Sequence, residues 1–184
     1  MAAHILVKAG LAGIIGLLAY SPETAKPLSE LAEVLLRSER EGSSLTPGER
    51  ELIASYVSSR NDCTFCCNSH SAAAAAHFDG NLEFVQTVVK DPEKAPISEK
   101  MKALLNIAGK VQISGKEVKQ TDIERARAAN ATDTEIHDAV LTSAAFCMYN
   151  RYVDGLGTDC SCDPKDYIKM GESMAHNGYV NFKK

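Results

Sequence analysis

Three cysteines and a histidine lie within eight positions in the stretch RNDCTFCCNSHSAAAAA, residues 60–76. Cys63 and Cys66 are three positions apart and Cys66 and His70 four apart, so a helix would place all three side chains on one face. Asn61-Asp62 predicts that this helix begins at Cys63, near the positive end of its dipole, where thiol pKa values are lowered. The spacing therefore suits a nucleophilic thiol with a neighbour able to trap it.

Two other uses of these cysteines fit the same residues. Cys63 and Cys66 could form a zinc site together with the distant Cys160 and Cys162, because four thiolates are the count of a structural zinc site. The C-x-C spacing of the second pair is tighter than the usual zinc knuckle, and a helical core of this size does not need a metal in order to fold. An inert pair of buried core cysteines is the remaining alternative.

Length and charge narrow the class of protein. The 184 residues contain no linker or repeat, so we expect a single domain spanning residues 1–184. A formal charge of −4 and the lack of any Lys/Arg-dense stretch argue against nucleic-acid binding. The most apolar stretch, residues 9–20, is shorter than the roughly 20 residues that span a bilayer, and it lacks a good signal-peptide cleavage site. We therefore expect a cytoplasmic protein with no membrane partner, in which six cysteines indicate redox or metal chemistry.

Helix signals dominate the rest of the sequence. Thr46-Pro47-Gly48-Glu49 is a capping box that predicts a helix from there to about Arg60. Similar boxes at Thr121-Asp122-Ile123-Glu124 and Thr132-Asp133-Thr134-Glu135 predict two more helices. Further helices are expected over 22–39, 82–89 and 98–111. The sequence therefore predicts an all-α fold, a compact multi-helix domain.

The chemistry-bearing residues also match a known family. Glu51, Cys63, Cys66 and His70 reproduce the Glu-x11-Cys-x2-Cys-x3-His pattern of the alkylhydroperoxidase D (AhpD)-like members of the carboxymuconolactone decarboxylase superfamily. Around this pattern, the stretches GLLAYSPETAKPLSELAEVLLR, SLTPGERELIASYVSSRNDCTFCCNSH and FCMYNRYVDGLGT resemble the peroxidase-related subgroup of that family. The resemblance covers most of residues 10–158 and implies an AhpD-like helical domain with the cysteine pair at a helix N-terminus.

The resemblance assigns a role to each residue of the pattern. It makes Cys66 the thiol that attacks peroxide and becomes a sulfenic acid, and Cys63 the partner that condenses with it to a disulfide. His70 and Glu51 become a proton relay. This agrees with their spacing, because His70 lies one turn below Cys66 and Glu51 can orient the imidazole from the preceding helix. Some members carry a second histidine where this chain has Phe65, so the relay depends on His70 alone.

The resemblance also implies an activity and partners. It implies a thiol-dependent peroxidase-like oxidoreductase in antioxidant defence, which reduces hydrogen peroxide or alkyl hydroperoxides through a Cys63–Cys66 disulfide cycle. No metal, haem or flavin cofactor is implied. The expected partners are an external dithiol reductant, lipoyl-like or thioredoxin-like, and further copies of the chain in a dimer, trimer or hexamer. The alternatives are a lactone decarboxylase of the same superfamily, which needs no redox thiols, and a non-enzymatic redox-sensing or zinc-binding protein.

The remaining cysteines and one histidine lie outside this pattern. Cys67 is rotated by about 100° from the reactive face. Cys147 lies on an apolar helical face and is expected in the core, and His77 is expected to be structural or exposed. Cys160 and Cys162 lie in a loop signal where solvent can reach them, and a disulfide between them would be strained and easily reduced. They could pass electrons from an external dithiol to the Cys63–Cys66 disulfide, although exposed loop cysteines are more often incidental.

Overall fold

The computed structural model describes residues 3–158 and 163–180, and all regular secondary structure within these ranges is helical. The elements are α1 (Gly13–Tyr20), α2 (Pro22–Leu36), α3 (Pro47–Arg60), α4 (Thr64–His77), α5 (Leu82–Lys90), α6 (Glu99–Ile113), the 3-10 turn η1 (Gly115–Glu117), α7 (Gln120–Ala128), α8 (Asp133–Gly155) and α9 (Pro164–Asn177). The predicted all-α class is therefore confirmed for the described residues.

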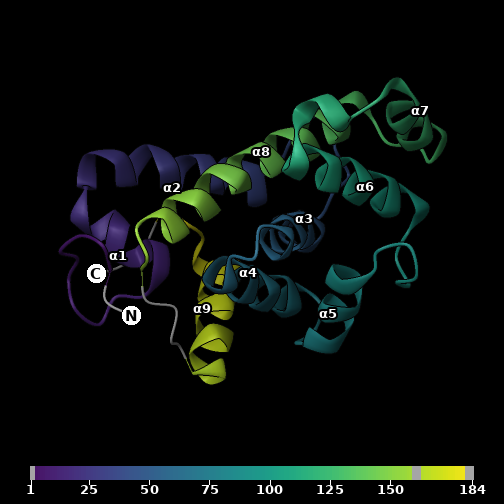
Figure 1. Ribbon diagram of the computed structural model, residues 1–184. Coiled ribbons are helices and arrows are strands. Elements are labelled where there is room, and N and C mark those ends of the chain that lie inside the picture. Colours follow the sequence, from purple (N-terminus) through teal and green to yellow (C-terminus); the bar gives the residue numbers. More distant parts are fainter. Residues whose placement is uncertain (1–2, 159–162, 181–184) are drawn as a thin grey trace.

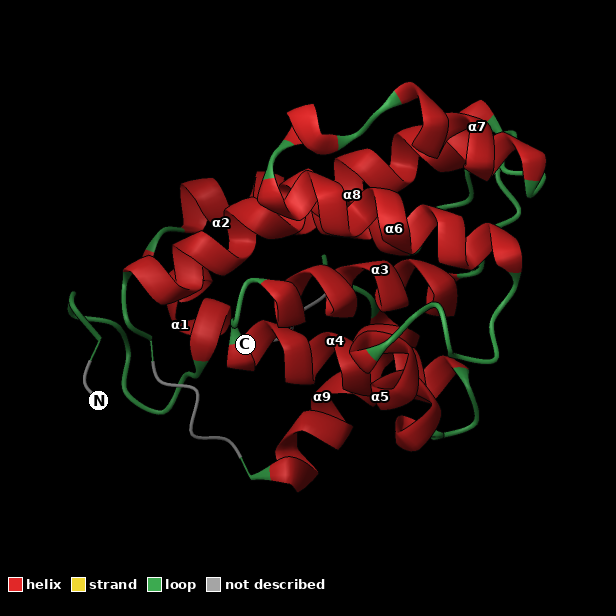
Figure 2. Cartoon of the chain, turned by 45° about the vertical axis from the view of Figure 1, so that its right-hand side comes forward, coloured by secondary structure: helices red, strands yellow, loops and turns green. Residues whose placement is uncertain are grey.

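The hairpin of α3 and α4 occupies the centre of the molecule (Figure 1). Helices α6 and α8 pack together and both contact α3, whereas α9 packs against α4. Figure 2 shows α6 and α8 above the hairpin and α9 beneath it. Helices α1 and α2 lie at one end of this arrangement, and α5 and α7 lie at the other. The central hairpin is thus enclosed by helices that arrive from distant parts of the sequence.

Side chains at the helix starts explain where most helices begin. The Thr46 hydroxyl accepts from Glu49 N at 3.2 Å while Glu49 Oε2 accepts from Thr46 N at 2.9 Å, so the predicted capping box is confirmed. The Thr132–Glu135 box is confirmed in the same way. The box predicted at Thr121 is wrong. Helix α7 begins at Gln120, and the Asp122 carboxylate accepts from Lys119 N at 2.8 Å, because Asp122 also pairs with Lys110 and is fixed in the first turn.

The turn between α3 and α4 differs slightly from the expectation. Asp62 has φ 57° and breaks the chain direction, and Cys63 is the N-cap residue of α4 rather than its first helical residue. Cys63 N donates to Ser58 O at 3.1 Å, which ties the turn back to α3. Helix α2 also ends at Leu36 rather than near Glu39. These shifts leave the cysteine pair at the N-terminus of α4, as predicted.

Helix α9 was not expected from the sequence, although its start signal is readable. Asp163 accepts from Lys165 N at 2.8 Å as N-cap, and Pro164 occupies the first helical position. Gly171 lies against the backbone of α4, where a Cβ would overlap Ala72 and Ala73. The helix therefore approaches α4 closely. It ends at Asn177, and the following Gly178, with a φ of 76°, turns the chain back toward the core.

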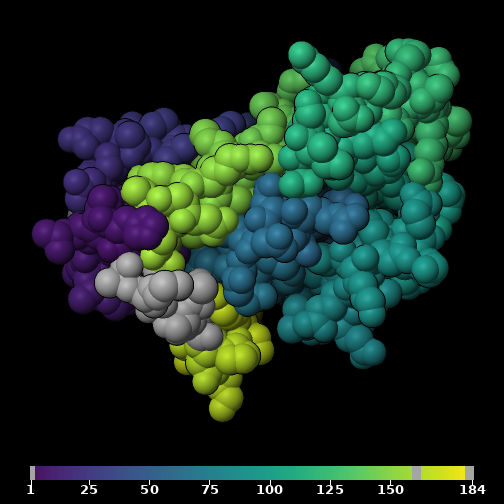
Figure 3. All heavy atoms as spheres, viewed as in Figure 1, coloured from purple at the N-terminus to yellow at the C-terminus, as the bar shows by residue number. Residues whose placement is uncertain are grey.

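The N-terminal segment packs beside the end of α8. His4 N donates to Leu156 O at 2.8 Å, and Figure 3 shows the purple N-terminal residues against the lime end of α8. Leu17 of α1 is fully buried in a cluster with the two motif cysteines. Within residues 3–158 and 163–180, every helix is too short or too polar to cross a bilayer.

Candidate active site

Cys63 and Cys66 lie at the N-terminus of α4 as free thiols, buried with 0% and 3% of their surface exposed. The thiol proton of Cys63 favours a negative charge on the sulfur of Cys66. Because Cys63 is the N-cap residue, Cys66 falls at the third helical position, within the turn where the dipole favours an anion. The surroundings of the pair therefore favour a negative charge on Cys66.

The two thiols have opposite electrostatic surroundings. The hydrogen bond from Cys63 lowers the pKa of Cys66, and the charge of His70 and a hydrogen bond from Asn150 lower it further, against the opposing effect of burial. The hydrogen bond to Cys66 raises the pKa of Cys63, and burial raises it further. Cys66 is therefore the thiol that ionises first, with Cys63 retaining its proton.

Two polar residues of α8 complete the surroundings of the thiols. Asn150 is fully buried, donates from Nδ2 to Ser58 Oγ at 3.0 Å and accepts at Oδ1 from Asn61 Nδ2 at 2.8 Å. These bonds fix the orientation of the amide, and its NH2 group contributes to the lowered pKa of Cys66. Asp154, four residues further along α8, adds a small effect that also raises the pKa of Cys63.

His70 and Glu51 are in direct contact, as the sequence pattern predicts. His70 Nδ1 lies 2.7 Å from Glu51 Oε2, and the Glu51 side chain is only 1% exposed. Since Nδ1 is engaged by the carboxylate, the other ring nitrogen is the one left for a thiol or a substrate oxygen. The imidazole is held by an edge-to-face contact with Phe146, at 4.6 Å between ring centroids.

Tyr179, which the sequence did not indicate, also reaches this pair. Its hydroxyl donates to Glu51 Oε1 and lies 3.5 Å from His70 Nδ1, and its ring stacks on the imidazole at 6.0 Å. Burial raises the pKa of Tyr179 well above its usual range, and the Glu51 charge adds to this effect. The hydroxyl therefore keeps its proton and acts as a donor to the carboxylate.

A cavity of about 70 Å³ opens beside the reactive thiol. Cys66 and His70 border it, whereas Cys63 does not, and most of its remaining wall is apolar. The other lining residues are Ile14, Ile15, Leu18, Leu28, Ser29, Ala32, Phe65, Ser69, Phe146, Tyr149, Met170, Met174 and Tyr179. Phe65, at the position where some members of the family carry a second histidine, is 3% exposed, and the backbone of Gly13 lies so close to its ring that a Cβ would overlap it. That position therefore contributes packing rather than a proton path.

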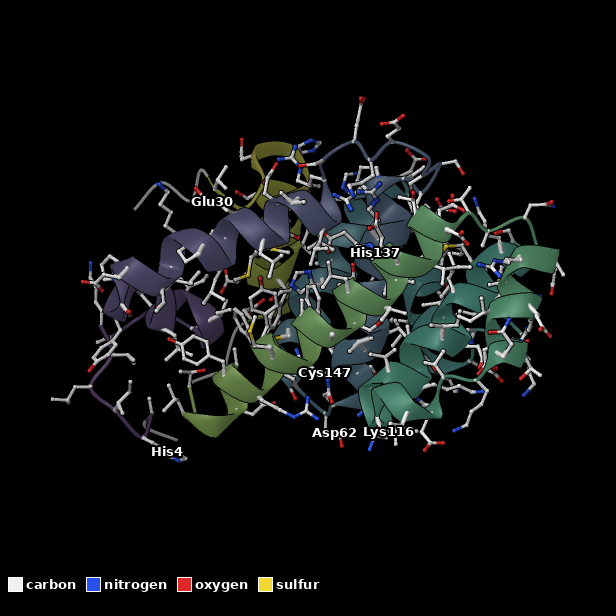
Figure 4. The ribbon with its side chains drawn as sticks, turned by 90° about the horizontal axis from the view of Figure 1, so that it is seen from above. His4, Glu30, Asp62, Lys116, His137 and Cys147 are labelled. Atoms are coloured by element: carbon white, nitrogen blue, oxygen red, sulfur yellow. The ribbon has the colours of Figure 1, made fainter. Side chains whose placement is uncertain are left out.

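The other described cysteines have no comparable support. Cys67 is half-buried, and burial raises its pKa although Ser71, Ser55 and Ser59 hydrogen-bond to it. Cys147 lies on α8 beside the turn that carries Asp62 (Figure 4), with its sulfur 3.6 Å from Asn61 Nδ2. It is half-buried and packs against the core, in agreement with the expectation.

Some expectations concern other parts of the chain. Cys160 and Cys162 lie outside the described residues, and so does the second half of the zinc site considered above. Within the described ranges, no three metal-binding side chains gather into a possible metal site. His77 is half-buried, and its Nε2 has no hydrogen-bond partner.

Sequence reasoning brought together Glu51, Cys63, Cys66 and His70 but missed three polar residues. Asn150 and Asp154 lie in the stretch FCMYNRYVDGLGT, where polar residues four apart on one helix were a usable signal. Tyr179 is 128 positions from Glu51 and carries no local signal. Only the packing of α9 brings it to the site.

Solved structures share this fold. An uncharacterized peroxidase-related protein from Ralstonia eutropha JMP134, described as an alkylhydroperoxidase AhpD core, has a TM-score of 0.75 and 26% identity over 89% of this chain and 83% of that chain. Another uncharacterized peroxidase-related protein, from Silicibacter sp. TM1040, has a TM-score of 0.72 and 25% identity over 83% of this chain and 76% of that chain. A protein of unknown function from Agrobacterium tumefaciens, named for AhpD, shares the fold at a TM-score of 0.64 with 21% identity, over 82% of this chain and 99% of that chain.

No protein-family model matches the sequence, and no curated protein matches it. The structural likenesses nevertheless define the class: this is an all-helical domain with the AhpD-like fold. More particularly, the chain is similar to the peroxidase-related proteins of that fold, which confirms the resemblance indicated by the Glu-Cys-Cys-His pattern.

Proposed function

We propose that the protein is a thiol-dependent peroxidase that reduces hydrogen peroxide or alkyl hydroperoxides through a Cys63–Cys66 disulfide cycle. The observation that carries the proposal is the cavity bordered by Cys66 and His70 and not by Cys63. A peroxide in this cavity would meet the thiol whose pKa is lowered, beside an imidazole able to exchange a proton. The apolar part of the wall suits the alkyl group of an organic hydroperoxide.

The first step consumes the peroxide. The Cys66 thiolate attacks the terminal oxygen, the O–O bond breaks, and Cys66 becomes a sulfenic acid that carries the hydroxyl group. The leaving alkoxide takes a proton from the His70 imidazolium and departs as an alcohol, or as water when the substrate is hydrogen peroxide. Glu51 stabilises the imidazolium until this proton is transferred.

The second step traps the sulfenic acid. The Cys63 sulfur attacks the Cys66 sulfur, the S–O bond breaks, and the hydroxide leaves as water with the proton that Cys63 gives up. An external dithiol, lipoyl-like or thioredoxin-like, then supplies two electrons and returns both thiols. We further propose that the protein works in a reducing compartment such as the cytoplasm and assembles into a homo-oligomer.

A time course of peroxide consumption by purified protein, supplied in turn with different dithiols, tests this function. Cys66→Ser should abolish consumption. Cys63→Ser should react once and accumulate a sulfenic acid that a dimedone-type probe traps, because the second step is blocked. Cys147→Ser is the matched control, since its thiol lies on α8 outside the cavity, and it should consume peroxide at the parent rate.

The reverse pattern, in which only the Cys63 variant loses the first oxidation, would exchange the two roles. Failure of the parent to consume any peroxide with any dithiol would remove the proposed activity. A lactone decarboxylase would differ in one further respect, because both cysteine variants would then retain the parent activity on its lactone.

A further inference from the structure

We propose that Tyr179 is a positioning residue that keeps the Glu51 carboxylate turned toward His70, so that the C-terminal segment is part of the machinery that activates the reactive thiol. The inference rests on the proposed function for the roles of Cys66 and His70. It adds a residue from outside the Glu-Cys-Cys-His pattern.

The burial of Glu51 creates the need for such a residue. Its side chain is 1% exposed, so water does not stabilise its charge. His70 Nδ1 satisfies one carboxylate oxygen at 2.7 Å, and the Tyr179 hydroxyl donates to the other. An ionised carboxylate that lost this second donor would keep an unsatisfied buried oxygen, and buried groups in that position tend to take up a proton.

Side chains of α2 hold the backbone of Tyr179 in place. Its backbone N–H donates to Glu33 Oε2 at 2.7 Å, and Glu33 is itself paired with Arg37 at 3.3 Å. Arg37 also reaches the carbonyl of His176 at 3.4 Å. Gly178 lies between these side chains with φ 76°, where a Cβ would overlap Arg37 and Glu33. Helix α2 therefore fixes the turn that delivers the tyrosine.

Other charged groups also face the relay. Cys63 and His77 do so from α4, Asp154 from α8, Glu33 and Arg37 from α2, and His176 acts on His77 from α9. All of these remain in a Tyr179→Phe variant. A change in the titration of Cys66 in that variant therefore reports on the tyrosine hydroxyl alone.

Tyr179→Phe keeps the ring against the imidazole and removes only the donor. Without it one carboxylate oxygen of Glu51 lacks a donor, so the carboxylate is held less firmly toward His70 and supports the Cys66 thiolate less through the imidazole. We expect the pH midpoint for iodoacetamide labelling of Cys66, read by peptide mass spectrometry, to rise by about half a unit, which is about threefold less thiolate at pH values below the midpoint.

Tyr149→Phe is the matched control. It also removes a buried tyrosine hydroxyl beside the same cavity, but that hydroxyl donates to Leu28 O at 2.9 Å and does not touch Glu51. Its labelling midpoint should equal that of the parent. Gly178→Ala is the second variant, because it keeps the Tyr179 hydroxyl and displaces the turn together with the Glu33 and Arg37 side chains that hold it. It should raise the midpoint in the same direction by a smaller amount.

An unchanged or lowered midpoint in folded Tyr179→Phe overturns the inference, as does an equal rise in Tyr149→Phe. If Tyr179→Phe does not fold, the midpoint of Gly178→Ala decides in the same way. The labelling measurement does not need peroxide. A parent that consumes no peroxide, combined with a raised midpoint in Tyr179→Phe, would therefore reject the proposed function and leave this inference standing.

Discussion

Two glutamates of this protein are equally buried, each 1% exposed, and differ in the partners of their carboxylates. Glu135, at the start of α8, accepts from Ser44 N at 2.9 Å, from Thr132 N at 2.9 Å and from Lys100 Nζ at 2.8 Å. Glu51 contacts His70 and Tyr179 instead. The two sites have the same burial and the same acid, but the hydrogen-bonding groups around them are of different kinds.

No partner of Glu135 exchanges a proton near neutral pH, because two are backbone N–H groups, one is the Lys100 ammonium, and the fourth is the Ser44 hydroxyl, which donates to Oε1 at 2.9 Å. Glu135 is therefore held as an anion at neutral pH and joins three segments of the chain. An imidazole can donate or accept, and it exchanges its proton near neutral pH. Glu51 thus belongs to a hydrogen-bonded set with His70 and Tyr179, in which the imidazole can gain or lose a proton. What separates a structural buried carboxylate from a reactive one here is whether its partners titrate.

Breaking the structural site should have the largest effect. In Glu135→Gln the amide NH2 group faces groups that are themselves hydrogen-bond donors, and Lys100 loses its counter-charge. The free energy of unfolding should therefore fall by about 3 kcal/mol. Urea unfolding at neutral pH measures this. Glu83→Gln, an exposed glutamate on α5, is the control and should change stability by less than about 0.5 kcal/mol. If Glu135→Gln lowers the free energy of unfolding by less than about 1 kcal/mol, the stability of the protein does not distinguish Glu135 from Glu51.

Acid should weaken the same site to a similar extent. Burial raises the pKa of Glu135, but hydrogen bonds from Lys100, Thr132 and Ser44 outweigh it and lower the pKa from 4.5 to about 2. The folded pKa is below the unfolded one, so this stabilisation is present above about pH 4.5 and is lost as the pH falls toward 2. The loss is on the order of 3 kcal/mol. Urea unfolding at several pH values should show a steeper decline for the parent than for Glu135→Gln, and parallel declines would contradict the assignment.

Removing His70 should be the largest perturbation of the reactive site. His70→Ala deletes the positive charge that helps to lower the pKa of Cys66, so the labelling midpoint of Cys66 should rise by about 1.5 units. His137→Ala provides the control, because the His137 side chain on α8 is 60% exposed and pairs with Asp138 rather than with a group of the site. Equal midpoints in His70→Ala and the parent would remove His70 from the relay.

Glu51→Gln should raise the same midpoint by about 1 unit with little loss of stability. The amide oxygen can still accept from Tyr179, and the NH2 group can donate to His70 Nδ1, so both hydrogen bonds survive. This arrangement forces the proton onto the other imidazole nitrogen, which can then no longer accept one from a thiol. The free energy of unfolding should stay within about 1 kcal/mol of the parent. A large stability loss without a midpoint change would mean that Glu51 resembles Glu135.

The smallest expected effect concerns Cys160 and Cys162. Their joint replacement by Ser should leave peroxide turnover within about twofold of the parent, a difference below roughly 0.5 kcal/mol. A collapse of multiple-turnover activity with the first oxidation intact would show that these cysteines pass electrons to the Cys63–Cys66 disulfide.

Local signals in the sequence predicted most of the fold. The boxes at Thr46 and Thr132 are visible because both partners lie three residues apart, and the structure contains both. The box at Thr121 failed because the partner that decides the start of α7 is Lys110, on another helix. A helix cap can be predicted from neighbouring residues. The position of the Asp122 carboxylate also depends on Lys110, which lies on another helix.

The same division explains the candidate site. Cys63, Cys66 and His70 share one helix, so their spacing predicted that they lie on one face. Tyr179 reaches Glu51 through the docking of α9 on α4 and the turn at Gly178, and no spacing in the sequence encodes either contact. Side chains that act on the relay from another element are therefore the part of the site that the sequence alone could not predict.

Gly171 lies in close contact with the backbone of Ala72 and Ala73. The size of the side chain that fits at one of these positions therefore depends on the residues at the others. A larger side chain on either helix would push α9 outward, and the cavity-lining Met170 and Met174 would move with it. The alanine run is thus more than a helix-forming sequence, because it leaves room for a second helix encoded about a hundred residues later. Substitutions at these positions should be inherited in pairs, and homologues that lose the alanines should lose the glycine as well.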